Sequence, residues 1–136
     1  MGDICVSDPR NSTLIILDSN LSFKESIKFP LPSCLSPYVL SALERKKATD
    51  SDIVFRPEGV CYDRYGRIIV ADPNANMVVR LSKSVDGQKY ELESLISKAD
   101  CHEPEYFRFP KLVAFGEDGR LWVVCHEYVL VFDYGI

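Results

Sequence analysis

The feature that most constrains the fold of this chain is a pattern that repeats along its sequence. Residues 55–72 share a proline, a valine, a Gly-Arg pair and a second valine with residues 108–125, at an offset of 53 positions (110 − 57 = 53). An apolar run follows each copy, at 77–81 and at 128–132. The second half of the pattern also occurs at 4–17, offset by 64 positions (70 − 6 = 64). Three copies indicate a fold made by repeating one structural unit.

The residue pattern of one repeat unit predicts a set of short antiparallel strands. Runs of β-branched and aromatic residues at 59–63 and 67–71 flank a tight hairpin in which Gly66 is expected to take a positive φ. A second turn follows, where the Asp72 carboxylate can accept backbone N–H groups. Residues 89–96 suit an outer fourth strand. The sequence therefore predicts an all-β fold of β-propeller blades, each with four antiparallel strands.

The repeat pattern is specific enough to suggest a family. Residues 55–81 carry Phe-x-Pro-x-Gly-Val-x-x-Asp-x-x-Gly-x-Ile-x-Val-Ala-Asp and then an apolar strand, which resembles the NHL repeat of tripartite-motif-type proteins. Residues 107–133 form a degenerate copy, in which Leu112 replaces the glycine and Gly116 and Cys125 replace the two aspartates. The resemblance implies a propeller that serves as a binding scaffold rather than as an enzyme.

The repeat boundaries divide the chain into four parts. Residues 1–29 are predicted to form a half blade, 30–52 a short helical insertion, 53–100 a complete blade, and 101–136 a degenerate blade without its outer strand. Closed propellers typically contain four to eight blades. The sequence thus predicts an incomplete propeller, and the preferred interpretation is a fragment of a larger ring. A homo-oligomer that completes the ring is the alternative.

The composition of the chain indicates which kind of partner it binds and in which cellular compartment it acts. The 136 residues carry a formal net charge of −4, which is not the basic field expected of a nucleic-acid-binding domain. The sequence has no apolar run long enough to cross a bilayer, and no basic segment followed by an apolar one at its N-terminus. The five cysteines include no Cys-x-x-Cys pair, which favours reduced thiols in the cytoplasm.

In NHL propellers, binding commonly uses loops on one face, so the resemblance places the candidate site on the loops before each inner strand and between the second and third strands. The candidate binding residues in these loops are Arg56, Asn74, Asn76, Arg108, His126 and Glu127. A protein is the expected partner. RNA is the alternative, bound by Arg56 and Arg108 with Phe55, Phe107 and Phe109 beside them.

Two patterns raise the possibility of metal chemistry. Cysteine and histidine are adjacent at 101–102 and at 125–126, but neighbouring residues on a strand point to opposite faces. Cys125 is expected to be a small buried hydrophobe. Glu58 lies in a turn that resembles the metal-binding turn of gluconolactonase-type propellers, so a metal-dependent hydrolase fragment is a further alternative. Lys111 takes the equivalent position in the next unit. We therefore predict no cofactor, no metal and no catalytic residue.

Overall fold

The computed structural model describes residues 2–29, 55–87, 89–97, 101 and 103–134. The predicted helix within 30–52 lies outside these ranges. Among the residues that the structure describes, no helix is long and apolar enough to span a membrane.

The described residues fold into ten strands and two short 3₁₀ helices. The strands are β1 (Ile4–Asp8), β2 (Thr13–Leu17), β3 (Phe23–Lys28), β4 (Gly59–Tyr62), β5 (Ile68–Asp72), β6 (Met77–Lys83), β7 (Tyr90–Ser97), β8 (Leu112–Phe115), β9 (Arg120–Val124) and β10 (Val129–Asp133). The 3₁₀ helices are η1 (Pro9–Asn11) and η5 (Pro104–Tyr106). This set of secondary-structure elements confirms the prediction of an all-β fold.

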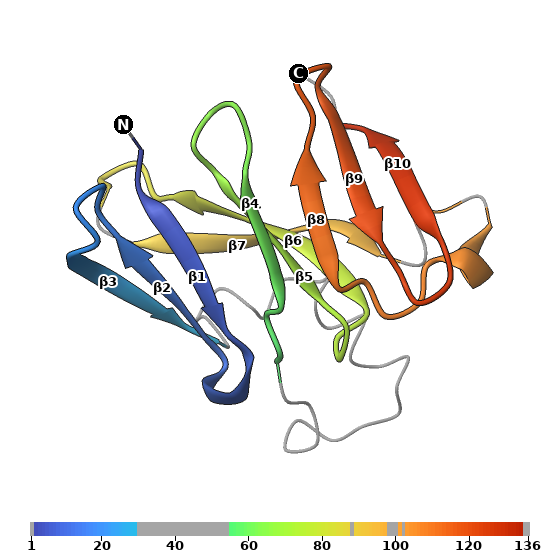
Figure 1. Cartoon of the computed structure of the whole chain (residues 1–136), viewed down its shortest axis with the longest axis horizontal. Helices are drawn as coiled ribbons and strands as arrows, with labels where there is room; N and C mark the ends of the chain where they lie inside the picture. The colour runs from blue at the N-terminus through green and yellow to red at the C-terminus, as the bar shows by residue number, and fades with distance from the viewer. Residues whose placement is uncertain (1, 30–54, 88, 98–100, 102, 135–136) are drawn as a thin grey trace.

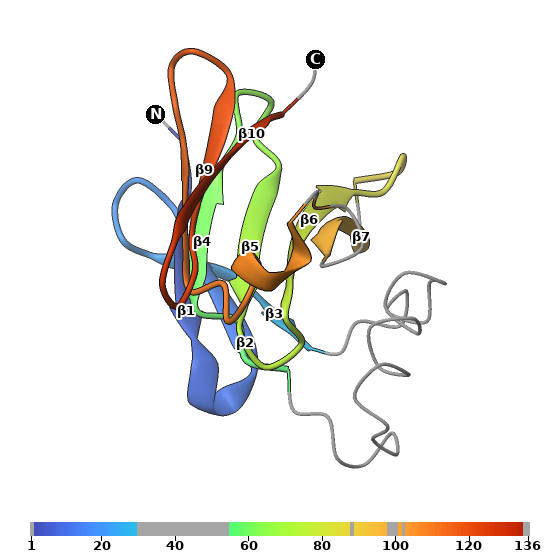
Figure 2. The same cartoon turned by 90° about the vertical axis from the view of Figure 1, so that its right-hand side faces the viewer.

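The strands form three antiparallel sheets that follow one another in chain order (Figure 1). The first sheet has the order β1-β2-β3, the second β4-β5-β6-β7 and the third β8-β9-β10. Strand β4 of the second sheet lies beside both β8 and β1. Figure 2 shows that the hairpins after β4 and β8 lie at one end of the sheets and the β1–β2 connection at the other.

Two apolar clusters hold the three sheets together. The first joins the first two sheets and includes Leu14, Ile16, Val70 and Leu81. The second joins the second and third sheets and includes Ile69, Ala71, Val78, Leu121 and Val123. All five residues of β5 are buried, and the side chains of its four apolar residues alternate between the two clusters. The middle sheet is therefore covered on both faces.

The predicted turn geometry is present in the second and third sheets. Gly66 has φ +79° and Gly119 has φ +82°, and both close hairpins between the first two strands of a sheet. The N–H of Asp63 donates to the carbonyl of Arg67 at 2.9 Å, and the N–H of Gly116 donates to that of Arg120 at 2.8 Å. The positive φ expected at Gly66 is therefore confirmed, and Gly119 shares it.

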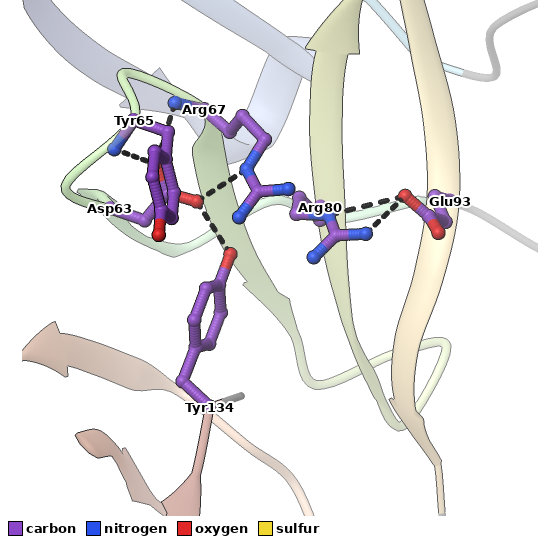
Figure 3. Close-up of polar contacts among 6 residues, drawn as sticks. All are labelled: Asp63, Tyr65, Arg67, Arg80, Glu93 and Tyr134. Carbon is purple, nitrogen blue, oxygen red and sulfur yellow. Dashed lines mark hydrogen bonds and ion pairs between the residues drawn. The ribbon is translucent and has the colours of Figure 1, made fainter. Parts of the chain in front are cut away.

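A buried carboxylate links the second and third sheets at this hairpin end (Figure 3). Asp63 is only 6% exposed. One of its oxygens accepts the N–H groups of Tyr65 at 2.8 Å and Arg67 at 2.9 Å. The other accepts the Arg67 Nε–H and the Tyr134 hydroxyl, both at 2.6 Å. Burial would raise the pKa of the carboxyl, but these hydrogen bonds outweigh it and hold the pKa below its ordinary value.

Next to this network, a charged pair crosses two strands of the second sheet. The guanidinium of Arg80 in β6 contacts the carboxylate of Glu93 in β7 at 2.6 Å (Figure 3). The two residues are paired in the β6–β7 register. This pair places a polar side chain in a strand that is otherwise mostly apolar and buried.

Candidate functional site

The structure brings the six candidate binding residues to one end of the sheets, the end opposite the Gly66 and Gly119 hairpins (Figure 1). Arg56 and Arg108 precede the first strands of the second and third sheets, and the other four lie in the turns after β5 and β9. We call this end the loop face. It consists of residues 55–58, 73–76, 107–111 and 125–128.

Asp72 fixes the part of the loop face that belongs to the second sheet. It is 4% exposed at the end of β5. One carboxylate oxygen accepts the backbone N–H of Arg56 at 2.8 Å, and the other accepts those of Asn74 at 2.9 Å and Ala75 at 3.0 Å. The predicted role of Asp72 as a turn acceptor is confirmed. Its carboxylate holds Arg56 and Asn74 through their backbone N–H groups, and Asn74 is exposed to solvent.

Arg56 and Glu58 form an ion pair rather than two separate binding groups. The Arg56 Nε lies 3.0 Å from Glu58 Oε1, and the Arg56 side chain is 47% exposed. The Glu58 carbonyl accepts the hydroxyl of Ser7 at 2.6 Å. Within the described ranges, no group of three or more His, Cys, Asp or Glu residues is arranged to hold a metal ion.

Asn76 fixes the part of the loop face that leads into the third sheet. It adopts φ +53°. Its Oδ1 accepts the N–H of Phe109 at 2.9 Å, and its Nδ2 donates to the carbonyl of Phe107 at 3.3 Å. The side chain of this predicted binding residue therefore also positions the segment that carries Arg108.

Replacing Asn76 with alanine is expected to lower the free energy of unfolding by about 2 kcal/mol, because it removes two hydrogen bonds and leaves an alanine at positive φ. Asn76→Gly should lose less, since glycine adopts this φ without strain. Urea unfolding followed by circular dichroism measures both. An alanine variant as stable as the wild type would show that Asn76 does not hold the segment.

Exposed aromatic and charged side chains gather around the third-sheet part of the loop face. Phe109 is 46% and Tyr128 is 44% exposed. The Phe109 ring meets the His126 ring edge to face, with centroids 6.0 Å apart, and the Arg108 guanidinium lies 6.0 Å from the Phe109 ring. Tyr106 and Tyr128 pack with centroids 4.3 Å apart. We call these five residues the aromatic cluster.

The main chain fixes the aromatic cluster. The N–H of His126 donates to the carbonyl of Arg108 at 2.8 Å, and the N–H of Cys125 donates to that of Tyr128 at 2.8 Å. Cys125 is 5% exposed, as expected of a small buried hydrophobe, and burial raises the pKa of its thiol. The members of the cluster other than Phe109 line a hollow of about 30 Å³, which is room for a water molecule rather than for a small-molecule substrate.

The structure separates the three phenylalanines that were expected near the candidate arginines. Phe55 and Phe107 are buried, at 8% and 0% exposed, and belong to the apolar clusters. Only Phe109 of the three is exposed. Tyr106 and Tyr128 were not among the predicted binding residues, although each lies within two positions of one and could have been found by that proximity.

A larger hollow of about 610 Å³ lies at the hairpin end and contains none of the candidate binding residues. Tyr62, Lys83 and Tyr90 are among the side chains that line it. The hydroxyl of Tyr62 is buried and has no hydrogen-bond partner within the described part of the chain. Burial raises the pKa of Tyr62 to about 12, so this phenol is protonated near neutral pH.

No protein-family model matches the chain, and no curated protein matches it. Among solved structures, it is similar to a catalytically inactive virginiamycin B lyase from Staphylococcus aureus with quinupristin, at 16% identity and a TM-score of 0.51. It is also similar to extracellular domains 1–2 of Drosophila Semaphorin 1b, at 12% identity and a TM-score of 0.51. Each match covers 96% of this chain, which spans 37% of the lyase and 25% of the semaphorin.

These similarities show the fold alone. Both neighbours are β-propeller-like, so the predicted propeller-type arrangement of the three sheets is confirmed. Membership of the NHL family stays a prediction, because no family model matches. One neighbour is an enzyme and the other a semaphorin, and one fold can carry unrelated functions.

Proposed function

We propose that this chain is a non-catalytic recognition module that binds a protein partner through its loop face. The observation that carries the proposal is the aromatic cluster, whose exposed rings stand on loops fixed by hydrogen bonds. Rigid, partly exposed aromatic residues and arginine are typical anchors of protein interfaces. Binding residues are often presented on loops by a rigid scaffold of this kind.

The charges around the aromatic cluster favour a protein over RNA. Glu105 and Glu127 line the same small hollow as Arg108 and His126, so acidic and basic residues occur there together. Arg56 is already paired with Glu58. A surface that follows an RNA backbone needs an excess of positive charge, whereas a protein interface accommodates both signs. RNA remains the second candidate because Arg108 and Phe109 together offer a cation and a stacking ring.

The ion pair of Glu58 and the state of the cysteines bear on two further points, the hydrolase alternative and the compartment. The pairing of Glu58 with Arg56 disfavours the hydrolase alternative, in which Glu58 would be a metal ligand. The chain is proposed to act in the cytoplasm, because Cys5, Cys61 and Cys125 are free thiols in the structure.

The double variant Phe109→Ala, Tyr128→Ala is expected to weaken partner binding by about 30-fold or more, since loss of even one of two hot-spot side chains costs about 2 kcal/mol. Partners captured by the wild-type chain from a cell extract would be identified by mass spectrometry and titrated against both proteins. Tyr65→Ala is the matched control, because Tyr65 is 55% exposed at the hairpin end.

The same titration separates the alternatives. Binding that disappears after nuclease treatment, or that falls steeply with salt, would assign the loop face to RNA instead. Equal affinity of the double variant and the wild type would contradict recognition by the aromatic cluster. Binding lost in Tyr65→Ala but kept in the double variant would move the site to the hairpin end.

A further inference from the structure

The outer face of the third sheet carries an apolar patch exposed to solvent. Leu112 is 58%, Trp122 43%, Val124 36%, Val129 56% and Val131 43% exposed. Val124 is paired with both Leu112 and Val129, and Trp122 is paired with Val131, so all five side chains point to the same side of the sheet. A contiguous apolar patch of this kind commonly marks an interaction surface.

The outer face of the first sheet, at the other end of the row of sheets in Figure 1, is also apolar. Ile4 is 40% and Val6 is 43% exposed. They pair across the β1–β2 register with Leu17 and Ile15, which are half-buried. Phe23 extends this patch on β3 and is 66% exposed. The row of three sheets thus ends in an apolar face on both sides.

The sequence repeat shows what the patch on the third sheet is suited to contact. Trp122 and Val124 lie 53 positions after Ile69 and Ala71 (122 − 69 = 53). In the second sheet, Ile69 and Ala71 are buried against the third sheet. The outer face of the third sheet therefore repeats the surface with which the second sheet packs against its successor.

The patch on the first sheet corresponds to the opposite side of that interface. Four residues of this patch each lie 64 positions before a residue of the second sheet (68 − 4 = 64). The pairs are Ile4 with Ile68, Val6 with Val70, Ile15 with Val79 and Leu17 with Leu81. The four residues of the second sheet are buried against the first sheet. The outer face of the first sheet therefore repeats the surface with which the second sheet packs against its predecessor.

We infer that a second copy of this chain covers both patches by packing head to tail. The third sheet of one copy would lie on the first sheet of the other, with the same kind of contact that joins the sheets within one chain. Two such contacts related by a twofold axis close a ring of six sheets, within the four to eight blades of known propellers. Closure buries every apolar end face, which is the physical reason for the dimer.

The mass of the 136-residue chain in solution tests this inference directly. One chain has a mass of 15.4 kDa, so light scattering at micromolar concentration should give about 31 kDa (2 × 15.4 = 30.8). A monomer would overturn the inference and assign the patches to further sheets of a longer chain. A distribution of larger, growing species would also overturn it, because the contacts would then propagate without closing.

Variants on the two faces test the head-to-tail geometry. Trp122→Lys and Val6→Lys should each give a monomer, since every contact uses one face of each kind. Mixing the two variants should restore a dimer, because one chain then keeps an intact third-sheet face and the other an intact first-sheet face. Val85→Lys is the control and should stay dimeric, since Val85 lies in the turn between β6 and β7.

The same variants distinguish the head-to-tail arrangement from a dimer that joins two identical faces. A dimer that is broken by Trp122→Lys but kept by Val6→Lys would join two third-sheet faces and overturn the head-to-tail arrangement. Circular dichroism checks that each variant keeps its strands. If either lysine variant fails to fold, Val129→Lys and Ile4→Lys test the same two faces, with the same expected results.

Discussion

Gly59→Ala is expected to lower the free energy of unfolding by about 3 kcal/mol or more, the largest effect among alanine substitutions of the described glycines. A Cβ at this position would lie 2.4 Å from the carbonyl oxygen of Lys111 and 2.6 Å from the Cα of Leu112. Both are main-chain atoms at the start of β8, so no side chain can move aside to relieve the clash. The second and third sheets would have to separate around Gly59.

Urea unfolding of the whole chain, followed by circular dichroism, measures this loss. Gly2→Ala is the first control and should have no effect, because its Cβ would meet nothing within 4 Å. Gly66→Ala is the second, since it also has open space but has φ +79°, and it should lose only about 1–2 kcal/mol from backbone strain. If Gly59→Ala costs no more than Gly66→Ala, the close packing of the two sheets is wrong.

Asp63→Asn is expected to destabilise the chain by about 2–3 kcal/mol at neutral pH, the second large effect. The substitution preserves the shape of the side chain but removes the charge that accepts hydrogen bonds from Arg67 and Tyr134. An amide that presents an N–H group to these donors also leaves them without an acceptor. The variant should therefore loosen the contact of the third sheet with the hairpin of the second.

The effect of Asp63 should depend on pH in a defined direction. Its pKa in the folded chain is held below the ordinary value, so the unfolded chain takes up the proton first as the pH falls. The stability that Asp63 provides is complete above the ordinary carboxyl range and is lost as the pH falls below about 4. The difference between wild type and Asp63→Asn should therefore shrink on acidification, which thermal unfolding at several pH values would show.

Two further variants separate the parts of this network. Tyr134→Phe removes one of the hydrogen bonds and should lose about 1–1.5 kcal/mol. Asp118→Asn changes an exposed carboxylate in the corresponding hairpin of the third sheet and should change stability by less than about 0.5 kcal/mol. Equal effects of Asp63→Asn and Asp118→Asn would contradict the special role of the buried carboxylate.

Short-range structure was predictable because it depends on residues that are close in the sequence. The positive φ of Gly66 follows from a four-residue turn, and the contacts of Asp72 with Asn74 and Ala75 follow from a side chain that reaches its own next residues. Runs of β-branched and aromatic residues indicated the strands, and the repeated copies of the pattern indicated the number of sheets. The common location of the six candidate residues was expected from the resemblance to NHL propellers.

Tertiary structure decided what depends on residues from different sheets. Gly59 is required because Lys111 of another sheet approaches it, and the repeat hides this requirement by placing Leu112 at the equivalent position. Phe107 and Phe109 are the same residue type two positions apart, yet Phe107 is buried and Phe109 is exposed. The chain turns between them because Asn76 binds the backbone there and Phe109 has a positive φ. The sequence by itself determined the strands, their turns and the order of the sheets, since these rest on local geometry. Which aromatic rings reach solvent, and which apolar faces remain uncovered, was decided by packing between segments far apart in the chain.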